Sequence, residues 1–212
     1  MAADVSDLVS FDEFITHWAA DRPSRIAMRE EDRLFTYAEL EERTARVASA
    51  LRAAGLEKGD RIAWIGKNSD LYFTLFFGAA RAGIVMAPIG WRLSPVEWAY
   101  IINDTRAKIV FTGPGFDAVP DQLAGKLDHA PRIVGDTEAR ALIDATPRAP
   151  FTPSGPDDAV LQLYTSGTTG NPKGAVLSNR NLFALRKNSA DADLAYTKWD
   201  DDEAVLVAMP CA

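Results

Sequence analysis

The chain has 212 residues, of which 47% are hydrophobic and 25% are charged, so it can bury a core and is not disordered throughout. Its 23 basic and 30 acidic residues give a net charge of −7, which argues against non-specific binding to nucleic acid or to an anionic membrane. A single cysteine, Cys211, excludes a disulfide framework and a multi-cysteine metal site. The first residues lack the basic and apolar regions of a secretory signal, so we expect a cytoplasmic protein.

Helical and strand patterns alternate over the first 112 residues. Thr36 with Glu39, and Ser94 with Glu97, have the spacing of a capping box, which marks the start of a helix. Helices are predicted at 11–20, from 36 to a C-cap at 55, at 71–82 and from 94; strands are predicted at 25–29, 61–65, 84–88 and 108–112. This alternation predicts an α/β fold with a largely parallel sheet flanked by helices.

The most apolar stretch runs from Leu71 to Trp91 and contains one charged residue, Arg81. An arginine in mid-span costs roughly 2.5–3.5 kcal/mol on membrane-insertion scales, and Gly83 and Pro88 interrupt the run. We therefore interpret the stretch as a buried helix followed by a buried strand, and we expect no transmembrane segment.

The composition changes after residue 112, because seven of the twelve prolines fall between Pro114 and Pro156. We predict an N-terminal α/β subdomain at 1–145 and an extended proline-rich linker at 146–157. Residues 158–212 would then begin a second α/β subdomain with its own sheet, which this chain leaves incomplete. Its strands are expected at 159–164, 175–177 and 204–208, and Ser178 is expected to cap a helix.

Residues 165–174 connect two of these strands and combine the residue types that bind phosphate. Glycines let the backbone approach an anion, hydroxyls bond phosphate oxygens or a phosphate-bound Mg²⁺, and a lysine supplies positive charge. The residues are Thr165, Ser166, Gly167, Thr168, Thr169, Gly170, Lys173 and Gly174. The P-loop motif is excluded, because Pro172 precedes the lysine and no hydroxyl residue follows it. A stretch of this composition alone is more often a flexible hairpin loop.

The order of residues in Tyr164–Gly174, YTSGTTGNPKG, resembles the phosphate-loop signature of the adenylate-forming, or AMP-binding, superfamily. All nine fixed positions of the pattern TSGTTGxPKG are matched. The chain departs from many members at Asn179, where they carry histidine. Further segments resemble the family upstream: Phe35–Leu40, Gly59–Ala63, Ala79–Val85 and Pro88–Pro95, the last of which favours stand-alone acyl-CoA synthetases.

The resemblance implies a reaction in two steps. A carboxylate attacks the α-phosphate of ATP, which gives an acyl-adenylate and pyrophosphate, and a thiol, usually that of coenzyme A, then takes the acyl group. Lys173 and Thr165 are the implied catalytic residues, and Thr165 is the implied Mg²⁺ ligand. ATP binding is implied for Thr165, Ser166, Gly167, Thr168, Thr169, Gly170 and Lys173.

Members of the family are more than twice as long as this chain, so we expect an N-terminal portion that needs a C-terminal half in cis or in trans. Alone, it is expected to be inactive. The alternatives are a truncated, non-catalytic nucleotide-binding module, a partner subunit, or an inactive fragment. Fatty acids, aryl acids and other small carboxylic acids all remain open as substrates, and so does the identity of the thiol acceptor.

Overall fold

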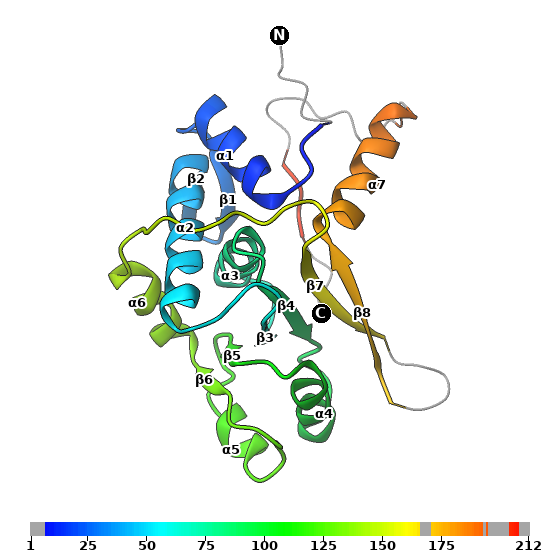
Figure 1. The fold of residues 1–212 in the computed structure, drawn as a ribbon. Helices are drawn as coiled ribbons and strands as arrows, with labels where there is room; N and C mark the ends of the chain where they lie inside the picture. Colours follow the sequence, from blue (N-terminus) through cyan, green and yellow to red (C-terminus); the bar gives the residue numbers. More distant parts are fainter. Residues whose placement is uncertain (1–6, 166–170, 193, 195–203, 208–212) are drawn as a thin grey trace.

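The computed structural model describes residues 7–165, 171–192, 194 and 204–207 (Figure 1). The helices are α1 (Phe11–Asp21), α2 (Tyr37–Ala53), α3 (Asp70–Arg81), α4 (Pro95–Thr105), α5 (Val119–Leu123), α6 (Asp136–Ala145) and α7 (Asn179–Asp191). The strands are β1 (Ile26–Glu30), β2 (Arg33–Thr36), β3 (Arg61–Ile65), β4 (Val85–Ile89), β5 (Ile109–Thr112), β6 (Arg132–Val134), β7 (Ala159–Thr165) and β8 (Lys173–Ser178).

Six strands form the main sheet in the order β6-β5-β3-β4-β7-β8, and β1 and β2 form a separate antiparallel hairpin. Neighbouring strands of the main sheet are parallel, except that β8 runs antiparallel to β7. The predicted α/β class, with a largely parallel sheet flanked by helices, is confirmed.

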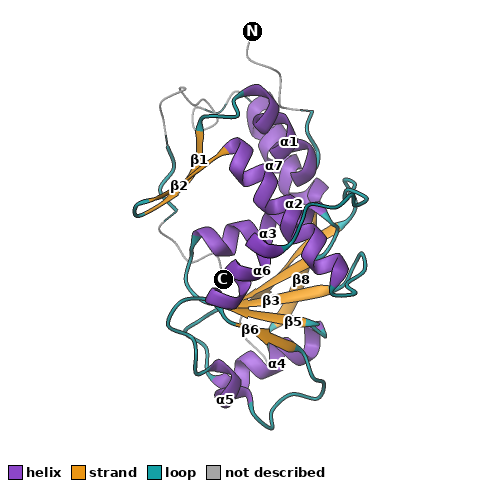
Figure 2. Cartoon of the chain, turned by 90° about the vertical axis from the view of Figure 1, so that its left-hand side faces the viewer, coloured by secondary structure: helices purple, strands orange, loops and turns teal. Residues whose placement is uncertain are grey.

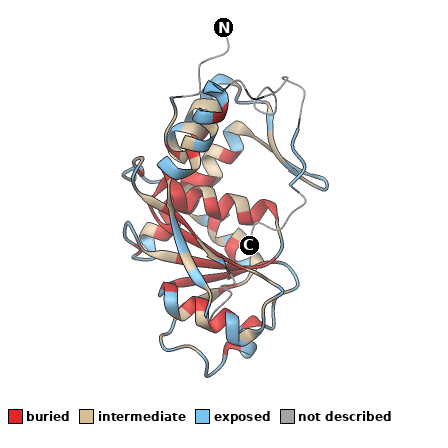
Figure 3. Cartoon of the chain, turned by 90° about the vertical axis from the view of Figure 1, so that its right-hand side faces the viewer, coloured by how far each residue is buried: buried red, intermediate tan, exposed pale blue. Residues whose placement is uncertain are grey.

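Helices cover both faces of the main sheet (Figure 2). Successive side chains of β3 point to opposite faces, so Ile62 and Trp64 pack in one apolar cluster and Ala63 and Ile65 pack in another. The first cluster includes residues of α2, α3 and α6, and the second includes residues of α4 and α5. Figure 3 shows that burial is concentrated in the central strands and in the helices packed on them.

The strand that we expected to open a second sheet belongs instead to the main one. β7 lies parallel to β4, with Met86 paired to Leu161. All five residues of β4 are buried, so its backbone groups on the side away from β3 need hydrogen-bond partners that water cannot supply. β7 provides that neighbour, and its own Val160 is fully buried in the first apolar cluster. The expectation of a separate sheet at this point is wrong; the subdomain division at 1–145, 146–157 and 158–212 stays a prediction.

Several helix starts lie where their capping residues predict them. The Thr36–Glu39 and Ser94–Glu97 capping boxes are both formed, and Ser178 caps α7. Four elements were not expected, namely β2, α5, β6 and α6. The strand expected at 204–208 is not found over 204–207, which carry neither helix nor strand, and residue 208 lies outside the described residues.

No helix among the described residues is both long and apolar enough to cross a membrane. The stretch interpreted from sequence as a buried helix and strand forms α3 and β4, most of whose residues are buried.

The proline-rich segment at 146–157 contains no helix or strand, yet it is fixed to the helices beneath it (Figure 1). The amide of Ala149 donates to the hydroxyl oxygen of Ser49 at 2.9 Å. The amide of Ser154 donates to the backbone carbonyl of Arg81 at 2.8 Å. The segment therefore follows one path across α2 and α3 to the start of β7.

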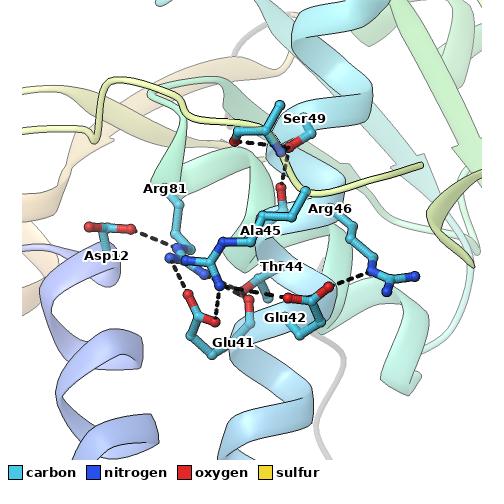
Figure 4. Close-up of polar contacts among 10 residues, drawn as sticks. Asp12, Glu41, Glu42, Thr44, Ala45, Arg46, Ser49 and Arg81 are labelled. Atoms are coloured by element: carbon cyan, nitrogen blue, oxygen red, sulfur yellow. Dashed lines mark hydrogen bonds and ion pairs between the residues drawn. The ribbon is translucent and has the colours of Figure 1, made fainter.

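The guanidinium of Arg81 is the most buried cation of this region, with 3% of its side chain exposed (Figure 4). It donates to Asp12 at 2.7 Å, to the carboxylate of Glu41 at 3.0 Å and to the hydroxyl of Thr44 at 2.8 Å. The same guanidinium lies 5.5 Å from the ring centre of Phe151 in the proline-rich segment. One cation thus connects α1, α2 and α3 beneath that segment.

We expect Arg81→Ala to destabilise the protein by about 3 kcal/mol, because it leaves the half-buried carboxylate of Asp12 without its cation and removes one of the two cations paired with Glu41. Arg132→Ala, which removes an exposed ion pair with Glu138, should cost at most about 1 kcal/mol. Urea unfolding of both variants measures the difference. Equal losses in the two variants would contradict a central role for Arg81.

Asp70 provides a second buried charge, at the first turn of α3. Its carboxylate accepts hydrogen bonds from Arg140 at 2.7 and 2.8 Å and from Arg33 at 3.0 Å. Burial alone would raise the pKa of Asp70, but the hydrogen bonds and charges of Arg140 and Arg33 hold it well below its ordinary value. The ion pairs therefore stabilise the fold in full above the pKa of the unfolded chain, and this stability is lost as the pH falls through the folded pKa.

We expect Asp70→Asn to destabilise the protein by about 3 kcal/mol at pH 7. The difference in unfolding free energy from the wild type should shrink once the pH falls below about 4, because the Asp70 carboxylate then binds a proton in the unfolded chain while it stays charged in the folded protein. Urea unfolding between pH 7 and pH 3 measures this. The exposed control Asp117→Asn should change little. A difference for Asp70→Asn that stays constant over the range would refute the assignment.

Candidate functional site

The antiparallel pairing of β7 and β8 places Thr165 directly opposite Lys173. Both side chains are exposed. β7 is parallel to β3, β4 and β5, so its carboxyl end lies beside the carboxyl ends of those strands (Figure 1). We call this side of the sheet its carboxyl edge. Open α/β sheets bind ligands at that edge. The structure thus brings together the two residues predicted to be catalytic.

The ammonium group of Lys173 has no carboxylate partner among the described residues, so it is available to an anionic ligand. Thr165 offers a hydroxyl from the facing strand. The other predicted phosphate contacts, Ser166, Gly167, Thr168, Thr169 and Gly170, lie outside the described residues.

The next pair along the two strands joins Tyr164, which precedes Thr165 on β7, to Gly174, which follows Lys173 on β8. The hydroxyl of Tyr164 donates to the carboxylate of Asp104 on α4 and accepts from Nε2 of Gln162 at 2.9 Å. Burial raises the pKa of Tyr164 above its ordinary value, and the hydrogen bond and charge of Asp104 raise it further. The phenol therefore remains a hydrogen-bond donor at neutral pH. The sequence alone gives no sign of this contact, because Asp104 lies far from the loop in the chain.

Asn179 lies at the other end of β8, at the start of α7, and is fully buried. Its Nδ2 donates to the hydroxyl oxygen of Ser154 at 2.9 Å and to the carbonyl of Gly155 at 3.0 Å. Its Oδ1 accepts from the amide of Phe11 at 3.3 Å. The residue that departs from the family pattern therefore ties α1 and the proline-rich segment to the strand that carries Lys173.

Two more cations lie on loops at the carboxyl edge of the sheet, Lys67 after β3 and Arg92 after β4. The guanidinium of Arg92 lies 4.5 Å from the ring centre of Trp91, and the ammonium of Lys67 lies 5.4 Å from it. The ring also contacts Phe116 edge-on. Although the chain is acidic overall, this edge carries positive charge suited to anionic ligands.

The model of the AMP-binding enzyme family matches residues 15–212. The chain belongs to the AMP-binding enzyme family. A fatty acid–acyl-carrier-protein ligase of Streptomyces coeruleorubidus is 36% identical over 195 residues, which are 91% of this chain and 37% of the relative. A feruloyl-CoA synthase of an Amycolatopsis species is 38% identical over 190 residues, 89% of this chain and 36% of the relative.

Among solved structures, a fatty acyl-CoA synthetase of Mycobacterium tuberculosis superposes with a TM-score of 0.77 and 29% identity, over 86% of this chain and 37% of that one. This chain therefore spans little more than a third of the length of the AMP-binding relatives it matches. The family resemblance and the expectation of an N-terminal portion are confirmed. The roles of individual loop residues stay predictions.

We expect Asn179→Ala to destabilise the protein by about 1–3 kcal/mol, because it removes three hydrogen bonds and leaves the hydroxyl of buried Ser154 and the amide of Phe11 without that partner. Asn188→Ala, on an exposed position of α7, serves as the control and should change the unfolding free energy by less than about 0.5 kcal/mol. Thermal or urea unfolding gives both values. A neutral Asn179→Ala variant would contradict the anchoring role.

Proposed function

We propose that this chain is the N-terminal part of an ATP-dependent carboxylic acid–CoA ligase, which converts a carboxylate to an acyl-adenylate with release of pyrophosphate and transfers the acyl group to a thiol. The observation that carries the proposal is the pairing of Thr165 with Lys173 at the carboxyl end of β7, in a chain of the AMP-binding family. The named activities of the relatives, fatty acid and feruloyl ligation, support a fatty or aryl acid as the substrate.

Lys173 would bind the phosphate oxygens of ATP and stabilise the negative charge that grows on the leaving pyrophosphate. Its exposure and lack of a described carboxylate partner fit that role. Thr165 would donate its hydroxyl to a phosphate oxygen from the opposite strand. The hydroxyls of Ser166, Thr168 and Thr169 and the backbone of Gly167 and Gly170 would complete the loop around the phosphates.

Mg²⁺, when bound with ATP, neutralises phosphate charge. Thr165 fits the hard-oxygen preference of this ion, because its exposed hydroxyl is the type of oxygen ligand that Mg²⁺ accepts alongside phosphates and water. Coenzyme A is the proposed thiol substrate. The proposed location is the cytoplasm, which is supported by a cysteine content that permits no disulfide within the chain.

The test is ATP–pyrophosphate exchange by the complete protein, assayed with a panel of fatty and aryl acids. We expect acid-dependent exchange in the wild type. In Lys173→Ala, kcat/KM should fall by about 100-fold or more, which is the loss typical when one donor that stabilises a transition state is removed from an enzyme. Lys126→Ala, at an exposed position outside the site, is the matched control and should keep full activity.

Exchange that is unchanged in Lys173→Ala would refute the role of the lysine. ATP binding without exchange for any acid would instead favour the alternative, a non-catalytic nucleotide-binding module.

A further inference from the structure

The ring of Tyr164 lies over Gly174, and this arrangement leaves no room for a larger residue at 174. A Cβ added to Gly174 would lie 2.8 Å from Cζ of Tyr164 and 2.6 Å from Nε2 of Gln162. Such distances are shorter than real Cβ contacts, so the ring, the Gln162 amide or the strand would have to move. The glycine therefore permits the close approach of both side chains, and its backbone conformation is not unusual.

A residue of α4 also holds the ring of Tyr164 in place. Its hydroxyl donates to Asp104 near the end of α4 and accepts from Gln162 of its own strand. α4 is itself held firmly, because Trp98, Ile101 and Ile102 are buried in the second apolar cluster. Tyr164 thus connects the end of β7 to a rigid helix.

The end of β8 that carries Lys173 has no comparable support among the described residues. In the part of the chain that the structure describes, β8 pairs with β7 alone, at the edge of the sheet, and most of its side chains are exposed or half-buried. The position of Lys173 relative to Thr165 consequently depends on the β7–β8 ladder and on the ring that packs across it. A displaced ring would move the backbone next to Lys173.

We propose that Tyr164, anchored by Asp104 and seated on Gly174, is a positioning residue that fixes the distance between Thr165 and Lys173 for phosphate binding. The inference rests on the proposed function, since it assigns these two residues to the phosphates of ATP. Tyr164 acts through Lys173 and makes no contact with the reacting atoms.

The test compares Tyr164→Phe, Asp104→Asn and the double variant in ATP–pyrophosphate exchange by the complete protein. Both single variants remove the same hydrogen bond and keep the size of the side chain. We expect each to raise KM for ATP and to lower kcat/KM for ATP about tenfold, and the double variant to be no worse than either. KM for the carboxylic acid should not change. Tyr37→Phe, a half-buried phenol on α2, is the matched control and should behave as the wild type.

This pattern separates positioning from a loss of folded protein. Partial unfolding lowers kcat in proportion to the active fraction and leaves both KM values unchanged. Gly174→Ala should give the same rise in KM for ATP as the other variants. Gly135→Ala, where the nearest atom to an added Cβ is 4.0 Å away, should not.

Wild-type values of KM for ATP in Tyr164→Phe and Asp104→Asn, or additive effects in the double variant, would overturn the positioning role while the proposed function stands. A wild type without any acid-dependent exchange would instead refute the proposed function. Titration of the variants with Mg·ATP would then test the inference by itself: weaker binding in both single variants supports it, and unchanged binding overturns it.

Discussion

The pairing of β7 with β4 is the constraint on which the candidate site depends. β4 is buried along its whole length, so a strand must cover its open side. Because β7 is parallel to β4, its last residue, Thr165, emerges at the carboxyl edge of the sheet. β8 then folds back along β7 and brings Lys173 opposite Thr165. The two residues meet because of sheet topology, which no local signal in the loop specifies.

The route of the chain into β7 is fixed by buried polar groups. The backbone carbonyl of Arg81 accepts from Ser154, and the hydroxyl of Ser154 accepts from Asn179 at the end of β8. The guanidinium of Arg81 simultaneously pairs with carboxylates of α1 and α2. One connected set of hydrogen bonds and ion pairs therefore joins the N-terminal helices to the β7–β8 hairpin that carries the site. A substitution that displaces either part is expected to displace the other.

Features that depend on a few neighbouring residues could be predicted from the sequence. The capping boxes at Thr36 and Ser94 predicted helix starts, because these signals act within a few residues. The non-local features could not be predicted in the same way. The place of β7 in the main sheet and the contact of Tyr164 with Asp104 join distant segments. The prolines after residue 112 also obscured β6 and α6, which form because Val134 and Ile143 bury apolar surface against the sheet.

The most direct measurement of the central claim is a crystal structure of the complete protein with Mg²⁺ and a non-hydrolysable ATP analogue. We expect triphosphate oxygens within hydrogen-bond distance of both the Thr165 hydroxyl and the Lys173 ammonium. A triphosphate bound with neither residue in contact would contradict this expectation.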